Sequence, residues 1–231
     1  MAEAVEASGL AYQGIYIEQY RRSSVAIFPF DHGMEYSRGV LVYRLGGSTF
    51  EVSVRKVDGG SYDIMSSVYD QHLGGNDFNR RVIDHLLLTH KKKTGQDLYS
   101  DDTFLLRLGS EVEKAKRLTR SQFEDLNMDL FTKTITAIDQ VIKDSVIYTK
   151  DDIQDIVFSG GSANIPFLQS AVREYFGRQK KYHGSNHPET TVVLGAAKLG
   201  HWYQDERHYG GQVGSSSQAL RRLPGVFHKS V

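Results

Sequence analysis

Cysteine is absent from this chain of 231 residues, which excludes a disulfide framework and any zinc site built on thiolates. An excess of charge is absent too, because 28 lysine and arginine residues balance 28 aspartate and glutamate residues. This balance argues against electrostatic binding of nucleic acid or of a membrane surface as the main activity. No apolar run approaches a membrane span, and the acidic start of the chain lacks the apolar core of a secretory signal. We therefore expect a soluble, cytoplasmic protein.

Motifs of several catalytic classes are also missing. The sequence contains no HExxH, no nucleophile elbow and no CxxC, and its nine histidines are scattered. Hydrophobic residues make up 39% of the chain and aromatic residues 11%, which is enough for a real core. The length allows one large domain or two small ones.

The clearest local feature is a glycine loop between two strand patterns. Apolar residues at 41–45 lead into this loop, and an alternating pattern follows over 50–57. The loop consists of Gly46, Gly47, Ser48 and Thr49. Unpaired N–H groups and two hydroxyls in such a loop can hold a phosphate, whereas a hairpin turn is the simpler interpretation. The loop by itself favours the hairpin.

The alternating pattern at 50–57 predicts a strand with two distinct sides. Phe50 and Val57 are assigned to the apolar side, and Glu51 and Arg55 to the polar side. The sequence Asp-Gly-Gly at 58–60 then predicts a second hairpin and a third strand up to about Val68.

Three helices are predicted from apolar residues at helical spacing. The first opens at about Phe78 and ends near 91–93, the second covers 104–118, and the third covers 123–146. The polar side of the second helix carries Glu113, Lys116 and Arg117. These three side chains form either an exposed ion-paired surface or a clamp, in which the carboxylate accepts from ribose hydroxyls and the cations flank a base.

A second glycine loop follows another short strand. The apolar residues 156–158 lead into Gly160, Gly161 and Ser162, and a helix over 167–176 follows a proline. A glycine loop before a helix N-terminus is a general site for an anion or a sugar edge. It is not a Walker loop, because no Gly-Lys-Ser/Thr follows.

Taken together and in order, these motifs resemble the nucleotide-binding domain of the heat shock protein 70 (DnaK-like) chaperone family, which has the actin-like ATPase fold. The residues similar to the family are the second phosphate loop at 45–53, a glycine segment at 70–78, the adenosine-clamp helix at 113–117, the adenosine loop at 157–166 and the final loop and helix at 187–197. The resemblance implies an α/β, ribonuclease H-like half-domain, with a mixed sheet, flanking helices and an inserted helical subdomain.

The same resemblance implies the domain organisation. Residues 41–200 correspond to lobe II of the nucleotide-binding domain, with the helical insert at about 76–138. Residues 1–40 are then a short N-terminal remnant, and residues 201–231 a flexible tail.

Adenine nucleotide, ATP or ADP, is the ligand that the resemblance implies. The implied binding residues are Gly46, Gly47, Ser48, Thr49, Glu113, Lys116, Arg117, Gly160, Gly161, Ser162, Asn164 and Glu189. The family has an aspartate that organises Mg²⁺ where this chain has Arg44, which places Mg²⁺ binding in doubt. Arg44 can instead contact a phosphate directly. Ser48 replaces a glycine, Glu51 an aspartate, and Asn164 an arginine that stacks on adenine.

We therefore expect a chaperone-like protein that binds adenine nucleotide weakly and is associated with ATP-dependent protein folding. No catalytic residue or metal ligand is assigned, and a pseudo-ATPase is expected because only one lobe is recognised. The implied partners are adenine nucleotide, co-chaperones, unfolded protein clients, or another chain that supplies the missing lobe. The alternative is a nucleotide-independent protein-interaction module derived from the same lobe.

Overall fold

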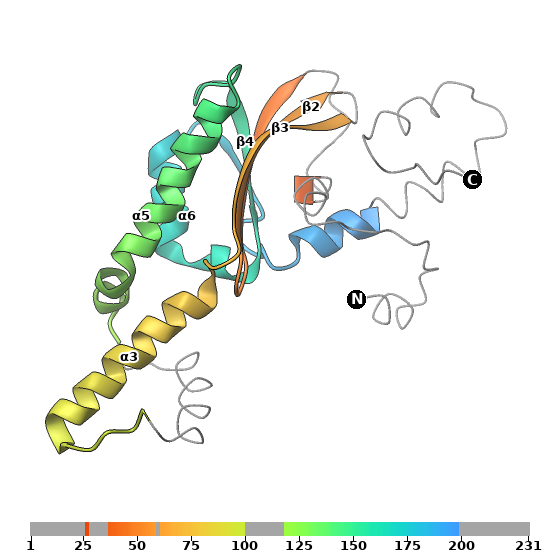
Figure 1. Ribbon diagram of the computed structural model, residues 1–231. Helices are drawn as coiled ribbons and strands as arrows, with labels where there is room; N and C mark the ends of the chain where they lie inside the picture. Colours follow the sequence, from red (N-terminus) through yellow and green to blue (C-terminus); the bar gives the residue numbers. More distant parts are fainter. Residues whose placement is uncertain (1–25, 28–36, 59–60, 100–117, 199–231) are drawn as a thin grey trace, which may run out of the picture.

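The computed structural model describes residues 26–27, 37–58, 61–99 and 118–198. Its centre is a mixed sheet of five strands in the order β3-β2-β1-β4-β5 (Figure 1). The strands are β1 (Arg38–Leu45), β2 (Phe50–Asp58), β3 (Ser61–Asp70), β4 (Ile153–Ser159) and β5 (Lys181–His183). The first three strands pair antiparallel as a meander, whereas β4 lies parallel to β1 and β5 parallel to β4.

Two helices cover one face of this sheet. They are α5 (Arg120–Asp144) and α6 (Pro166–Phe176), which lie together on that face in Figure 1. Their apolar sides meet strand residues such as Leu41, Tyr43 and Phe158 in one buried cluster. The helix α3 (Gly75–Thr94) leaves the lower end of the sheet and joins the same core through the aromatic ring of Phe78. The Phe78 and Phe131 rings lie 5.1 Å apart, and the Phe131 and Phe167 rings 4.6 Å apart.

The opposite face of the sheet is also buried. A smaller apolar cluster there contains Val40, Val42, Val57 and Val157, with Val192 from the helical residues 191–198 packed on it. The assignment of Val57 to the same side as Phe50 is therefore wrong. Because successive side chains of a strand point to opposite faces of the sheet, Val57 and Phe50, which are seven residues apart, lie on different faces.

The helix ends follow local sequence signals. Thr119 caps α5 by accepting from the Gln122 N–H at 3.2 Å, and Gln122 Oε1 accepts from the Thr119 N–H at 3.0 Å. Gly95 ends α3 with φ of 75°, a left-handed conformation that glycine adopts without strain. Three lysines lie in the last turn of α3, where cations complement the helix dipole.

Several sequence expectations can now be compared with the structure. The α/β class, the mixed sheet and the flanking helices are confirmed, and they are consistent with an actin-like ATPase half-domain. The helices predicted from 78 and over 123–146 are present, with ends shifted by a few residues. The predicted helix at 104–118 lies, except for its last residue, outside the described residues. None of the described helices is both long and apolar enough to cross a membrane.

Candidate functional site: three glycine loops at one end of the sheet

The candidate site lies where the parallel strands β1 and β4 end. Their register pairs Arg44 with Ser159, so the loops that follow them leave the sheet side by side. The first loop is 46–49, and the second begins at Gly160 and continues into the short 3-10 helix η2 (Gly161–Asn164). In open α/β sheets, ligands bind outside the carboxyl ends of the strands, where neighbouring connections diverge.

Close contacts at this end of the sheet explain two glycines, one in the second loop and one at the start of α3. A Cβ on Gly160 would lie 2.4 Å from the Leu45 carbonyl oxygen, and Gly160 has φ of 87°. A side chain is therefore excluded at Gly160 by space and by backbone conformation together. A Cβ on Gly75, at the start of α3, would lie 2.2 Å from Ser162 Oγ.

A third glycine segment, 74–76, joins the first two loops. The Gly75 N–H donates to the Gly46 carbonyl at 2.9 Å, and the Asn76 N–H donates to the Gly47 carbonyl at 2.7 Å. The sequence marked this segment as rich in glycine but assigned no site residue to it. The structure brings it against both predicted loops, which sequence spacing could not reveal because the contact depends on the strand topology.

The loops leave exposed backbone donors. Gly47, Ser48 and Gly161 are exposed, and within the described residues their N–H groups donate no hydrogen bond. The Gly46 N–H is used, since it donates to the Thr49 carbonyl at 2.9 Å and closes the tight turn. Exposed backbone N–H groups of this kind are donors that suit a phosphate or another anion.

The segment 187–189 lies beside the second loop and contacts it through a backbone carbonyl and a carboxylate; we call these two groups the rim of the second loop. The Gly160 N–H donates to the Pro188 carbonyl at 2.8 Å, and Asn164 Nδ2 donates to Glu189 Oε2 at 2.9 Å. The pKa of the Glu189 carboxyl lies below its usual value, mainly through hydrogen bonding to its own N–H and further through His187 and Asn164. Glu189 therefore carries its charge at neutral pH and can accept from hydroxyl groups. Pro188 was not predicted as a site residue.

Arg44 forms part of a buried charged group instead of a metal ligand set. Its guanidinium lies 3.9 Å from the Glu51 carboxylate, directly across the β1–β2 ladder. Arg55 approaches the other oxygen of Glu51 at 3.7 Å and is fully buried. Burial lowers the pKa of Arg55 to about 10, against the opposing effect of Glu51. Arg55 therefore remains cationic at neutral pH, and the substitutions at 44 and 51 belong to one ion-paired group.

The donor set at this end of the sheet does not fit a Mg²⁺ ion. Mg²⁺ takes oxygen ligands in octahedral geometry, and arginine offers only N–H donors and a permanent positive charge. Among the described residues, the carboxylate paired with Arg44 is that of Glu51, and it already lies between two guanidinium groups. In the described part of the chain, no three His, Asp or Glu side chains gather as a metal site would require.

The predicted binding residues fall into two groups. The structure brings together the glycine-loop and rim residues, namely Gly46, Gly47, Ser48, Thr49, Gly160, Gly161, Ser162, Asn164 and Glu189. The predicted clamp of Glu113, Lys116 and Arg117 lies outside the described residues.

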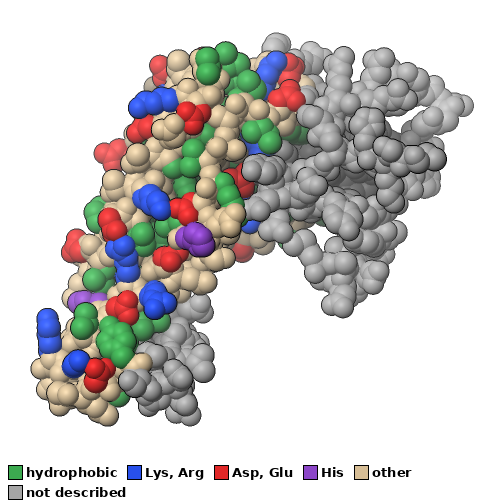
Figure 2. Space-filling model, in the orientation of Figure 1, with side chains coloured by type: hydrophobic (Ala, Val, Ile, Leu, Met, Phe, Trp, Pro, Cys, Tyr) green, Lys and Arg blue, Asp and Glu red, His purple; other side chains and the backbone are tan. Residues whose placement is uncertain are grey.

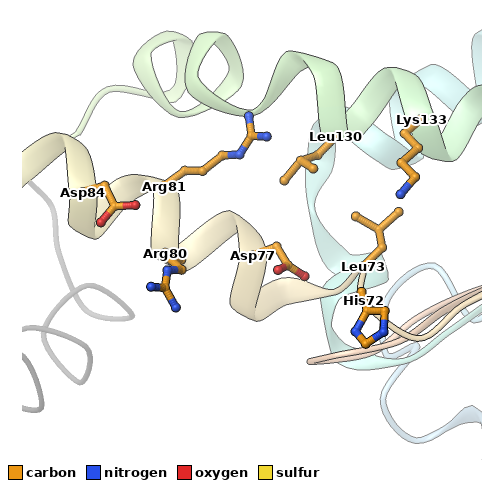
Figure 3. A pocket seen from close by; sticks show the side chains of 8 residues that line it. All are labelled: His72, Leu73, Asp77, Arg80, Arg81, Asp84, Leu130 and Lys133. Carbon is orange, nitrogen blue, oxygen red and sulfur yellow. The ribbon is translucent and has the colours of Figure 1, made fainter.

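A separate surface depression of about 280 Å³ lies between α3 and α5 (Figure 3). Two of the three arginine and lysine side chains that line it have acidic partners: Arg81 binds both oxygens of Asp129, and Lys133 contacts Asp70 at 2.6 Å. Acidic and basic side chains are interspersed over the face shown in Figure 2. This depression therefore offers no concentrated charge to an anionic ligand, in contrast to the glycine loops.

Comparison with known protein families gives a match over most of the chain. The family model described as Hsp70 protein matches residues 5–118 and 116–209. The matched ranges include all three glycine segments and the predicted clamp, together with Arg44. The chain therefore belongs to the Hsp70 family.

Proposed function

We propose that this chain binds ATP or ADP at the three glycine loops, as a chaperone-related protein that hydrolyses ATP poorly or not at all. Membership of the Hsp70 family implies chaperone-related nucleotide binding. The observation that supports this site is the convergence of loops 46–49, 74–76 and 160–162 at the ends of β1 and β4. The exposed N–H groups of Gly47 and Ser48 suit the phosphates.

Glu189, at the rim of the second loop, is the reason for placing the adenosine at the second loop and the phosphates at the first. Glu189 is ionised and lies beside Asn164, so it can accept from ribose hydroxyls while the loop backbone flanks the adenosine. We place the phosphates at 46–49 and the adenosine at 160–164. The clamp residues Glu113, Lys116 and Arg117 belong to the adenosine side in this proposal.

The assignment of residues 41–200 to lobe II is part of the same proposal. The sheet order, with an antiparallel meander of three strands followed by two parallel strands, is typical of a ribonuclease H-like half-domain. In this proposal, the two loops at the carboxyl ends of β1 and β4 correspond to the family's second phosphate loop and adenosine loop.

Poor hydrolysis follows from Arg44. Phosphoryl transfer depends on positioning and on metal ions that neutralise the developing charge. Removing a single stabilising donor from a catalytic site typically costs about 3–4 kcal/mol of transition-state stabilisation. Replacing a metal-organising carboxylate by a cation is a larger change than the loss of one donor, while ground-state binding through the loop backbone is retained.

Thermal shift and calorimetry with ATP and ADP test the proposal. A ligand present at ten times its dissociation constant stabilises the folded state by about 1.4 kcal/mol, which is about 3–6 °C in the melting temperature for a chain of this size. We expect such a shift at millimolar nucleotide. No shift from either nucleotide would contradict the proposal and favour the nucleotide-independent interaction module.

Gly161→Val is the sharpest variant for this test. A Cβ at Gly161 meets no atom within 4 Å, so the fold tolerates it, yet the side chain would occupy the exposed face of the loop. We expect an unchanged melting temperature without ligand and a lost nucleotide shift. The matched control is Gly177→Ala, where a Cβ likewise meets nothing but the residue lies beyond α6. Because Gly177 has φ of 86°, its variant loses some stability but should keep the nucleotide shift.

A further inference from the structure

We infer that Arg44 is the cation of this nucleotide site, so that the chain takes metal-free nucleoside polyphosphates and Mg²⁺ opposes their binding. This inference rests on the proposed function and specifies the ionic form of its ligand. It follows from the misfit between the charged group at the end of β1 and a metal ion.

The position of Arg44 is the first argument. Arg44 is the penultimate residue of β1, and loop 46–49 begins two residues later. Alternation along the strands places Arg44, Glu51 and Ser159 on the same face at neighbouring positions of β1, β2 and β4. The Arg44 side chain is 13% exposed, so its charge lies in a region with little water, where it acts more strongly than on an open surface.

The charge of the group is the second argument. The Glu51 carboxylate lies between the guanidinium groups of Arg44, at 3.9 Å, and Arg55, at 3.7 Å, so its negative charge is divided between two cations. At 3.9 Å the approach of Arg44 to Glu51 is an ion pair and not a hydrogen bond. The guanidinium donors of Arg44 are thus not used by Glu51, and an oxyanion at the carboxyl end of β1 can receive them.

Ser159 supplies an independent observation. It is 1% exposed at the end of β4, and its hydroxyl has no hydrogen-bond partner within the described part of the chain. A buried polar atom without a partner is unusual in a native protein and calls for an explanation. Ser159 lies opposite Arg44 in the parallel register and directly before Gly160. A bound phosphate oxygen, or its water, would accept from this hydroxyl and from Arg44 together.

Mg²⁺ opposes this arrangement for two reasons. When it coordinates the phosphates, it neutralises part of the negative charge that attracts Arg44. It also brings a hydrated dication towards a permanently charged guanidinium, and like charges in a site with little water repel strongly. Free ATP and free ADP should therefore bind more tightly than their Mg²⁺ complexes.

Isothermal titration calorimetry of the full chain with ADP, first in EDTA and then in excess MgCl₂, tests this inference. Ionic strength is matched in the two buffers so that screening of surface charge is equal. We expect about tenfold tighter binding in EDTA, equivalent to about 1.4 kcal/mol. Equal binding in both buffers, or binding that requires Mg²⁺, would overturn the inference and leave the proposed function intact. No binding in either buffer would overturn both.

Two substitutions at Arg44 separate its charge from its shape. Arg44→Lys keeps the charge and should keep the preference for the metal-free nucleotide, whereas Arg44→Gln should reduce the affinity in EDTA about tenfold and abolish the preference. Arg55 stays beside Glu51 in both variants, so the buried carboxylate keeps a cation and the fold is retained. An unaltered preference in Arg44→Gln would overturn the inference. The control is Arg80→Gln, an arginine on α3 that lines the separate depression.

Discussion

Substituting Gly160 by alanine perturbs the contact that holds the two strand-end loops together. The added Cβ would meet the Leu45 carbonyl oxygen at 2.4 Å and the Leu45 carbonyl carbon at 2.8 Å. Both atoms belong to the backbone of β1, so the neighbour cannot rotate away as a side chain would. The backbone of Gly160 also has φ of 87° and ψ of 144°, a region that is essentially restricted to glycine.

The two effects add to a large loss of stability. Forcing a non-glycine residue into a disfavoured backbone region costs about 1–3 kcal/mol, and overpacking a closely packed position costs about another 1–3 kcal/mol. We expect Gly160→Ala to lower the free energy of unfolding by about 2–5 kcal/mol. For a chain of this length, that corresponds to a fall of about 5–15 °C in the melting temperature.

Urea denaturation followed by circular dichroism measures this loss, and Gly161→Ala is its matched control. The two glycines are adjacent, but a Cβ at Gly161 has open space around it and Gly161 does not have the positive φ of Gly160. The control should change stability by no more than about 0.5 kcal/mol. Equal losses in the two variants would refute the argument from backbone contact and would mean that helix η2 itself is sensitive to any side chain.

Three further predictions follow from local geometry. Gly75→Ala should destabilise by about 1–3 kcal/mol through the clash with Ser162 Oγ, and adding Ser162→Ala should restore much of the loss in a double-mutant cycle by chemical denaturation. Val146→Gly should stabilise by about 1 kcal/mol in urea, because this β-branched residue has φ of 62° at an exposed turn; an unchanged midpoint would show that the strain is absent. The pKa of Asp155 lies below its usual value, because burial, which raises it, is outweighed by the hydrogen bond to His183 and by charge. The stabilising contribution of its carboxylate is thus present above about pH 4 and is lost as the pH falls through the folded-state pKa. In an acid-unfolding experiment, the free energy of unfolding of Asp155→Asn should therefore fall less steeply between about pH 5 and about pH 2 than that of the unsubstituted chain.

Sequence patterns predicted the elements well because their signals are local. The apolar spacing in α5 and the proline and glycine that bracket α6 depend only on neighbours in the chain, and both helices lie where they were expected. The ends differ by a few residues, since Thr119 begins α5 before the first apolar residue of the pattern. Alternation also predicted β2, although Val57 was placed on the wrong side.

The site was only partly predictable because its contacts are not local. The Gly-Gly loops at 46 and 160 were identified from their residues, and the family resemblance marked Arg44 as a departure. The pairing of Arg44 with Glu51, and the sharing of Glu51 with Arg55, require the register of β1 against β2 and the burial of that face. The role of Gly75 requires α3 to begin beside both loops.

The parallel pairing of β1 with β4 has a consequence for synthesis of the chain. Gly39 lies beside Ile153, and its N–H donates to the Gln154 side chain across 115 residues of sequence. Among the described strands, β4 is the one that covers the apolar β1 edge of the meander, and it is synthesised more than 80 residues after β3 ends. Unpaired edges of this kind promote aggregation, and pairing between distant segments is slow. While the chain is being made, the edge of β1 that β4 covers in the folded sheet would thus be exposed for the time needed to synthesise the helices between them.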